Sequence, residues 1–128
     1  FDIILTTNLF GDILSDEAAQ VTGSIGLAPA ANIGEKFALF EPVHGAAFDI
    51  AGKNIGNPTS FILALKMMFE WLGDKYNDKN LTYQSIKIEK AVDQLFINNI
   101  KTKDIGGRLS TIEFNDKFIQ LLDREGYA

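Results

Sequence analysis

The chain has 128 residues, of which 46% are hydrophobic and 23% charged, a composition that suits one folded domain or part of a larger one. A net charge of -5 argues against a nucleic-acid groove or an anionic membrane surface as partner, and no apolar run approaches the roughly 20 residues that cross a bilayer. The absence of cysteine excludes disulfides, thiolate zinc sites and a cysteine nucleophile, and it is compatible with the cytoplasm, where we expect the protein.

The chain opens on an apolar run, residues 1–5, that predicts a buried strand. A compact domain seldom begins inside a core strand, because chain ends usually lie at the surface. No charged-then-apolar signal segment opens the sequence. We therefore expect the chain to be part of a longer protein.

The next elements are short. Apolar residues recur at helical spacing from about residue 11 to residue 21. Residues 23–29 predict a loop, and residues 36–41, which carry two Phe and a Leu, predict a short strand. Residues 42–58 are too rich in Gly and Pro for regular structure. The residues that can share the inner face of the first helix are Ile13, Leu14, Ala18 and Val21.

Three helices with stronger sequence signals follow. The first is capped by Thr59 or Ser60 and ends at Gly73. The second runs from about residue 82 to residue 99, and the third begins at the capping box Ser110-Thr111-Ile112-Glu113. The apolar residues expected to face inward are Phe61, Ile62, Leu65, Met68, Phe69 and Leu72 in the first, Ile88, Val92, Leu95 and Phe96 in the second, and Phe114, Phe118, Leu121 and Leu122 in the third.

The alternation of strands and helices predicts an α/β fold whose sheet is incomplete in this chain, because two or three strands are too few for a whole sheet. We expect the missing strands upstream. Asp104-Ile105-Gly106-Gly107 predicts a tight turn, to which we assign no chemistry.

Two carboxylates, Asp12 and Asp16, are spaced to lie on one face of the first helix. Two oxygen ligands placed in this way suit a hard divalent ion such as Mg²⁺ or Mn²⁺. The spacing alone fits better with two acids that stabilise a helix start on a solvated face, where the helix dipole favours negative charge.

Residues 8–18 read Asn-Leu-Phe-Gly-Asp-Ile-Leu-Ser-Asp-Glu-Ala, and residues 23–29 read Gly-Ser-Ile-Gly-Leu-Ala-Pro. Together these two stretches resemble the signature of the isocitrate/3-isopropylmalate dehydrogenase family. The resemblance extends over essentially the whole chain. It implies the C-terminal portion of the fold of these β-decarboxylating dehydrogenases, as one unit over residues 1–128. The metal-site strand and helix then occupy about residues 1–30, and the NAD loop and helices about residues 31–128.

The resemblance implies that Asp12 and Asp16 bind the metal, Mg or Mn, with a third carboxylate supplied by the other subunit of a homodimer. Glu17 is a weaker candidate. A divalent cation held there would chelate the hydroxyl and a carboxylate of a 2-hydroxy acid substrate during hydride transfer and loss of CO₂. The resemblance places no catalytic residue in this segment, because the family's arginines, Tyr and Lys lie upstream.

The second block, from Glu41 to Pro58, contains no G-x-G-x-x-G fingerprint. Taken by themselves, His44 fits a loop residue with satisfied hydrogen bonds and Asp49 fits a turn. The resemblance implies instead that residues 45–57 wrap the adenosine half of NAD. The residues so assigned to the cofactor are His44, Gly45, Ala46, Ala47, Asp49, Ile50 and Asn57.

Within that loop, Asn57 is expected to read the adenine edge, and Asp49 to accept hydrogen bonds from the ribose hydroxyls, which favours NAD over NADP. Members that use NADP carry Lys and then Tyr at the positions of Asp49 and Ile50. One departure is Phe48, where most relatives have Pro, and it bears on the rigidity of the loop.

The tyrosines Tyr76, Tyr83 and Tyr127 match no catalytic motif, and Lys53 belongs to the cofactor loop. We do not expect the chain alone to turn over substrate. Among the family's substrates 3-isopropylmalate is favoured, since NAD use and a short C-terminal region are typical of that branch. Isocitrate, homoisocitrate and tartrate stay open as alternative substrates. Two alternatives of another class also stay open, a non-catalytic regulatory subunit of the same fold and an unrelated metal-dependent hydrolase that uses Asp12 and Asp16.

Overall fold

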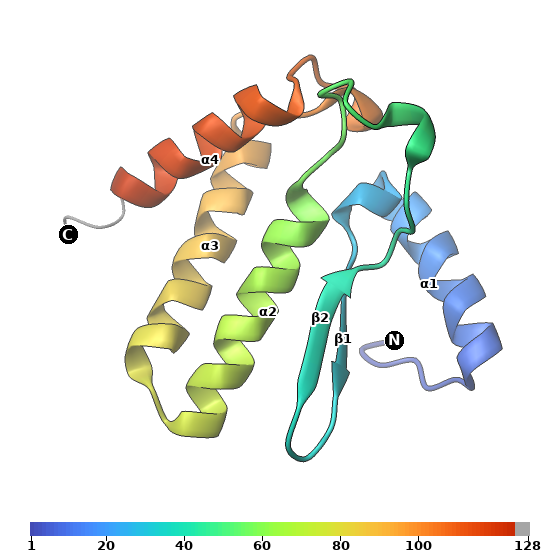
Figure 1. The fold of residues 1–128 in the computed structure, drawn as a ribbon, viewed down its shortest axis with the longest axis vertical. Coiled ribbons are helices and arrows are strands. Elements are labelled where there is room, and N and C mark those ends of the chain that lie inside the picture. The colour runs from blue at the N-terminus through green and yellow to red at the C-terminus, as the bar shows by residue number, and fades with distance from the viewer. Residues whose placement is uncertain (125–128) are drawn as a thin grey trace.

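The computed structural model describes residues 1–124, so Tyr127 lies outside the described part. The elements are, in chain order, α1 (Asn8–Thr22), β1 (Pro29–Ile33), β2 (Ala38–Pro42), α2 (Thr59–Tyr76), α3 (Lys79–Ile97) and α4 (Thr111–Arg124), with 3₁₀ turns at Ile25–Leu27, Phe48–Ile50 and Lys103–Ile105 (Figure 1). None of the helices within residues 1–124 combines the length and apolar character that a membrane crossing requires.

Strands β1 and β2 form an antiparallel hairpin, with Pro29 opposite Pro42 and Ile33 opposite Ala38. Strand β2 confirms the predicted strand over residues 36–41, whereas β1 was not predicted. Its sequence, Pro-Ala-Ala-Asn-Ile, has little of the β-branched and aromatic alternation that marks a strand. Tertiary contacts hold it in place, because the Ser60 hydroxyl donates a 2.7 Å hydrogen bond to the carbonyl of Ala28, just before the strand.

The core lies between α2, α3 and α4. The stripes predicted for α3 and α4 contribute to it, but the stripe predicted for α2 is partly wrong, because Phe61 and Leu65 are exposed and Ile62 is the one residue of that stripe that is buried. Helix α2 runs between the hairpin and α3, and α4 crosses the end of α3 (Figure 1). The side chains that form the buried cluster are Ile62, Ile88, Ala91, Val92, Leu95, Phe114 and Phe118. Phe40 of β2 packs beside Trp71 of α2, with ring centroids 6.0 Å apart, and so attaches the hairpin to the helical layer.

Two predicted boundaries of α2 are wrong. Thr59 and Ser60 lie inside the helix and are buried. The residue before the helix is Pro58, whose side chain makes no capping hydrogen bond, and the Asn57 side chain takes the capping role by accepting from the Thr59 N–H at 3.0 Å. The helix also continues past Gly73 to Tyr76. A Cβ at Gly73 would lie 2.5 Å from Thr82 Oγ1, so Gly73 allows α3 to approach closely rather than ending the helix.

The start of α4 confirms the predicted capping box. The Ser110 N–H donates to Glu113 Oε2 at 2.8 Å, and the Glu113 N–H donates back to Ser110 Oγ at 3.3 Å. Helix α3 begins three residues earlier than predicted, because Asp78 caps it by accepting from the N–H of Asn80 at 2.9 Å.

The predicted buried strand over residues 1–5 is wrong: this segment has no regular structure and Leu5 is 94% exposed. A strand needs a neighbour for its backbone hydrogen bonds, and the only sheet in the described residues consists of β1 and β2. The apolar stripe of α1 is also exposed, including Ile13, Leu14 and Val21, and only Ala19 of this helix is buried.

Candidate functional site

One hollow of about 230 Å³ brings together most of the residues predicted to bind the cofactor, and we call it the Asn57 hollow. Five of the seven line it, namely His44, Gly45, Ala47, Ile50 and Asn57. Its other wall includes Ser24 and Gly26, from the loop after α1, and Asp104, from the turn after α3. Residues far apart in the sequence therefore converge on the beginning of α2.

The remaining two predicted cofactor residues, Ala46 and Asp49, do not line the hollow. Asp49 is exposed in the 3₁₀ turn Phe48–Ile50, next to Ile50, which does line it. The turn is closed by the Ile50 N–H, which donates to the carbonyl of Ala47 at 3.2 Å. The carboxylate of Asp49 is thus available to a ligand that reaches the outer side of the loop.

The loop leaves room for a ligand beside its backbone. A Cβ at Gly45 would meet no atom within 4 Å, so packing inside the chain does not require a glycine at this position. Glycine does allow a ligand to approach the main chain closely. His44, beside it, is exposed, and its Nδ1 lies 3.0 Å from the carbonyl oxygen of Gly45. These features fit the adenosine part of a dinucleotide.

Asn57 has two structural partners that sequence reasoning did not identify. Its Oδ1 accepts from the Thr59 N–H, and its Nδ2 donates to Asp104 Oδ2 at 3.0 Å. The amide therefore caps α2 and links the cofactor loop to the turn after α3. One amide hydrogen and one lone pair of the oxygen remain for a ligand.

Asp104 is the residue of the site that sequence reasoning missed. Its carboxylate accepts hydrogen bonds from Ser24 Oγ at 2.7 Å, from Thr102 Oγ1 at 2.6 Å and from Asn57 Nδ2. Partial burial disfavours its ionised form, but the hydrogen bonds from Thr102, Ser24 and Asn57 outweigh burial and lower its pKa below the ordinary value. The sequence shows only an Asp in a turn, since Asn57 and Ser24 are 47 and 80 residues away.

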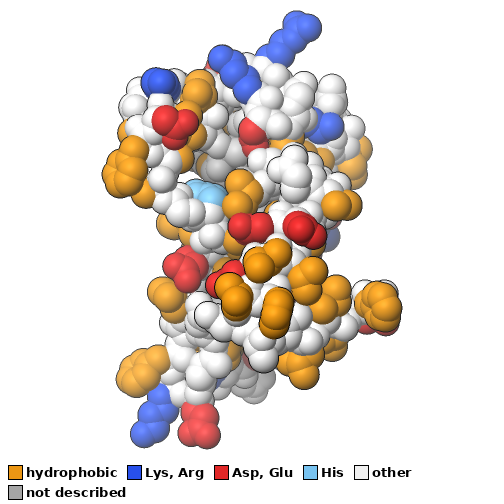
Figure 2. Space-filling model, turned by 90° about the vertical axis from the view of Figure 1, so that its right-hand side faces the viewer, with side chains coloured by type: hydrophobic (Ala, Val, Ile, Leu, Met, Phe, Trp, Pro, Cys, Tyr) orange, Lys and Arg blue, Asp and Glu red, His pale blue; other side chains and the backbone are white. Residues whose placement is uncertain are grey.

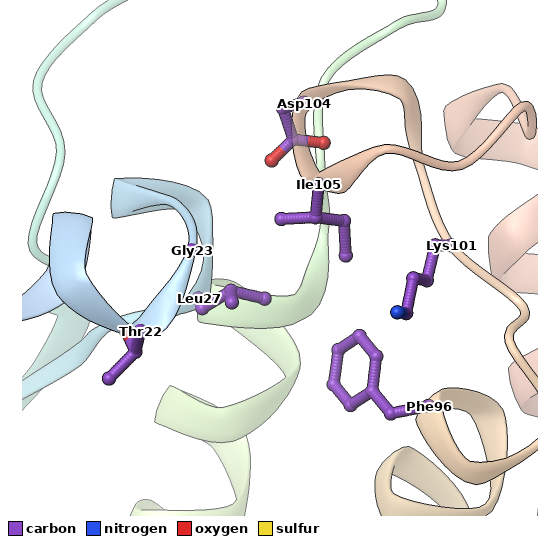
Figure 3. A pocket seen from close by; sticks show the side chains of 7 residues that line it. All are labelled: Thr22, Gly23, Leu27, Phe96, Lys101, Asp104 and Ile105. Carbon is purple, nitrogen blue, oxygen red and sulfur yellow. The ribbon is translucent and has the colours of Figure 1, made fainter.

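A second hollow, of about 460 Å³, lies beside the same turn and is lined by Leu27, Phe96, Lys101 and Ile105, among others; we call it the Phe96 hollow. Figure 3 shows the Ile105 side chain pointing into it, with Asp104 at its edge. It contains none of the residues predicted to bind the cofactor or the metal. Its larger volume therefore does not make it the better candidate site.

The two predicted metal ligands, Asp12 and Asp16, are exposed one helical turn apart on α1. Figure 2 shows the side of the molecule on which α1 lies, where acidic side chains are interspersed with apolar ones. Within residues 1–124, no group of three or more His, Asp or Glu side chains could hold a metal ion. The two carboxylates fit a hard divalent cation by their chemistry.

Comparison with known proteins gives a consistent result. The family model described as isocitrate/isopropylmalate dehydrogenase matches residues 1–118. A 3-isopropylmalate dehydrogenase of Sulfurisphaera tokodaii is 54% identical over 112 residues, which are 87% of this chain and 33% of that protein. A homoisocitrate dehydrogenase of Methanocaldococcus jannaschii is 47% identical over 125 residues, 98% of this chain and 34% of that protein.

Solved structures resemble this fold at similar coverage. The crystal structure of isocitrate dehydrogenase from Methylococcus capsulatus gives a TM-score of 0.80 at 40% identity and covers 90% of this chain and 33% of that one. The crystal structure of a β-decarboxylating dehydrogenase from Thermococcus kodakarensis gives a TM-score of 0.78 at 44% identity, and the match covers 91% of this chain and 32% of that one. The chain therefore spans about a third of the length of the relatives it matches.

Proposed function

The chain belongs to the isocitrate/isopropylmalate dehydrogenase family, and we propose that it works within a longer protein as the cofactor-binding and metal-binding part of a β-decarboxylating dehydrogenase. The reaction would oxidise a 2-hydroxy acid of the 3-isopropylmalate type, pass hydride to NAD and release CO₂. The name of the relative from Sulfurisphaera tokodaii supports this substrate class. The single observation that supports the proposal most is the Asn57 hollow, on which five of the predicted cofactor residues converge.

The adenosine half of NAD would occupy the Asn57 hollow, and the chain's own groups would bind and orient it. Asn57 has an amide hydrogen and a lone pair left to meet the base, and the bare backbone at Gly45 leaves space for close approach. Asp49, exposed beside the hollow, would accept hydrogen bonds from the ribose hydroxyls. Bound NAD supplies the hydride acceptor of the reaction.

Asp12 and Asp16 would hold a divalent cation, Mg²⁺ or Mn²⁺, which when bound supplies Lewis-acid stabilisation of negative charge on the substrate oxygens. Both side chains are exposed, and within residues 1–124 neither takes part in an ion pair. They are therefore available for coordination without the loss of an internal contact. A carboxylate from the other subunit of a homodimer would complete the ligand set.

The metal assignment is tested in the full-length protein with Asp12→Asn and Asp16→Asn, and with Asp93→Asn on α3 as an exposed control of equal charge change. Each of the two α1 variants should lower kcat about a hundredfold or more, because the cation contributes several kcal/mol to transition-state stabilisation. Calorimetric titration should show weakened Mn²⁺ binding in the same two variants. Normal Mn²⁺ affinity in either of them would reject the assignment.

The preference for NAD is tested with kcat/KM for both cofactors. NAD should be favoured, because the carboxylate of Asp49 accepts from ribose hydroxyls and repels the extra phosphate of NADP. The double variant Asp49→Lys with Ile50→Tyr should shift the preference toward NADP by removing that repulsion and adding a cation. A wild-type protein that already favours NADP would contradict the role of Asp49.

A further inference from the structure

We propose that Asp104 is a positioning residue for recognition of the nucleotide base: its carboxylate holds the Asn57 amide in one orientation, so that Asn57 presents a defined donor and acceptor to the base. This inference rests on the proposed function, because it takes the Asn57 hollow as the adenosine site. The turn that carries Asp104, for which the sequence alone indicated no functional role, thereby contributes to cofactor recognition.

The orientation of the amide follows from the chemistry of its two partners. The Thr59 N–H can only donate and lies 3.0 Å from Asn57 Oδ1, and an ionised Asp104 carboxylate can only accept and lies 3.0 Å from Asn57 Nδ2. A rotation of the amide by half a turn would set donor against donor and acceptor against acceptor. The lowered pKa of Asp104 keeps its carboxylate ionised at neutral pH, so the constraint persists.

Asp104 acts on the base through Asn57 rather than by direct contact, because most of its acceptor sites are already used. Oδ2 accepts from both Ser24 Oγ and Asn57 Nδ2, and Oδ1 accepts from Thr102 Oγ1. A carboxylate offers about four lone-pair sites in all. Three side-chain donors from three segments leave little capacity for a ligand.

The turn that carries Asp104 is itself held firmly. Thr102 is fully buried, and its carbonyl accepts from the N–H of Gly107 at 2.8 Å and of Ile105 at 3.3 Å. On the other side of the turn, the Ile105 side chain points into the Phe96 hollow (Figure 3). The carboxylate therefore has a fixed position from which to orient its partners.

The same carboxylate also steadies the opposite wall of the Asn57 hollow. Ser24 Oγ donates to Asp104 and accepts from the Gly26 N–H at 3.1 Å, which closes the loop after α1. Gly26 lies against Asn57, since a Cβ at this position would be 3.0 Å from Asn57 Cβ. Asp104 is thus the common hydrogen-bond partner of two walls of the hollow.

A fixed amide can distinguish bases by their hydrogen-bonding edges. Adenine presents an amino donor at position 6, whereas hypoxanthine presents a carbonyl acceptor there and is otherwise nearly the same shape. If Asn57 could rotate freely, it would adapt to either base. A held amide should favour one of them, and with NAD as cofactor that base is adenine.

The experiment uses the full-length protein and measures Kd for NAD and for nicotinamide hypoxanthine dinucleotide by calorimetric titration. The wild type should bind NAD more tightly. In Asp104→Asn the preference should fall about two- to tenfold, the effect of one net hydrogen bond of ordinary strength, while kcat at saturating NAD changes little. Asp93→Asn, an exposed substitution of equal charge change on α3, should keep the wild-type preference.

A double-mutant cycle separates positioning from a general structural role. The base preference of Asn57→Ala combined with Asp104→Asn should equal that of Asn57→Ala alone, because Asp104 acts on the choice of base only through Asn57, whereas its contact with Ser24 supports the binding of both dinucleotides alike. An additional loss of preference in the double variant would overturn the proposal. If Asp104→Asn does not fold, Asp104→Glu keeps the charge but moves the oxygens by one methylene, and it too should lose preference.

The outcomes distinguish this inference from the proposed function. A wild type that binds NAD but does not discriminate the two bases, or an Asp104 variant that keeps the full preference, overturns the positioning role and leaves the proposed function in place. A wild type that binds neither dinucleotide overturns the proposed function, and the inference with it.

Discussion

Thr59 and Thr102 are equally buried, both with 0% exposed surface, but only one of them has a partner for its hydroxyl. Thr102 Oγ1 donates to Asp104, whereas Thr59 Oγ1, at the start of α2, has no partner among the residues that the structure describes. Replacing each threonine with valine removes the hydroxyl and keeps the branched shape. We expect the two substitutions to change stability in opposite directions.

The magnitudes follow from the cost of burying a polar group. An unsatisfied buried hydroxyl costs about 1–3 kcal/mol, so Thr59→Val should stabilise the protein by about 1 kcal/mol, since Thr and Val have similar helix propensities. Thr102→Val removes a hydrogen bond to a charged group, worth about 1.5–3 kcal/mol when buried. Because Asp104 is partly exposed to solvent, we expect a loss of only about 1 kcal/mol.

Thermal unfolding of the full-length variants, followed by circular dichroism, measures the effect. For a domain of 150–250 residues, a change of 1 kcal/mol shifts Tm by about 2–4 °C, so the two variants should lie on opposite sides of the wild type. If Thr59→Val lowered Tm as Thr102→Val does, the Thr59 hydroxyl would have a partner in the folded protein, and the reasoning would be refuted.

Two further predictions concern Asp104 and its surroundings. Gly26→Ala should raise KM for NAD several-fold with a smaller effect on kcat in steady-state assays, because the new Cβ would press on Asn57 Cβ at 3.0 Å; an unchanged KM would mean that the loop shifts freely. The lowered pKa of Asp104 adds stability that is fully present above its ordinary value of 3.8 and is lost as pH falls through the folded value. Tm should therefore decrease less between pH 7 and pH 3 in Asp104→Asn than in the wild type. An equal decrease in the variant and the wild type would contradict this.

Features set by neighbouring residues could be predicted from the sequence. The capping box of α4 needs only Ser110 and Glu113, three residues apart, and it forms as predicted. The inward stripe of the same helix follows from its 3.6-residue period, and Phe114 and Phe118 are buried. The cofactor loop was located by its resemblance to the family, and the structure gathers most of its assigned residues around one hollow.

The features that the sequence did not reveal depend on distant partners. Asp104 looks like a turn residue until Ser24 and Asn57 are placed beside it. Asn57 was expected to meet the base, and its second role as the cap of α2 depends on where that helix begins. The apolar run over residues 1–5 shows strand character, but a run alone cannot form a strand when no neighbouring strand pairs with it.

The weak attachment of α1 has an energetic consequence for any ion that it holds. Among the described residues this helix buries only Ala19, and it packs mainly on the 3₁₀ turn that follows it. In this chain by itself, without the remainder of the longer protein, a helix held by so few contacts would open locally at a small free-energy cost. An ion bound by Asp12 and Asp16 would use part of its binding free energy to order α1, which lowers the apparent affinity. By linkage the same ion would protect α1 from opening, so metal occupancy and the order of this helix would rise together.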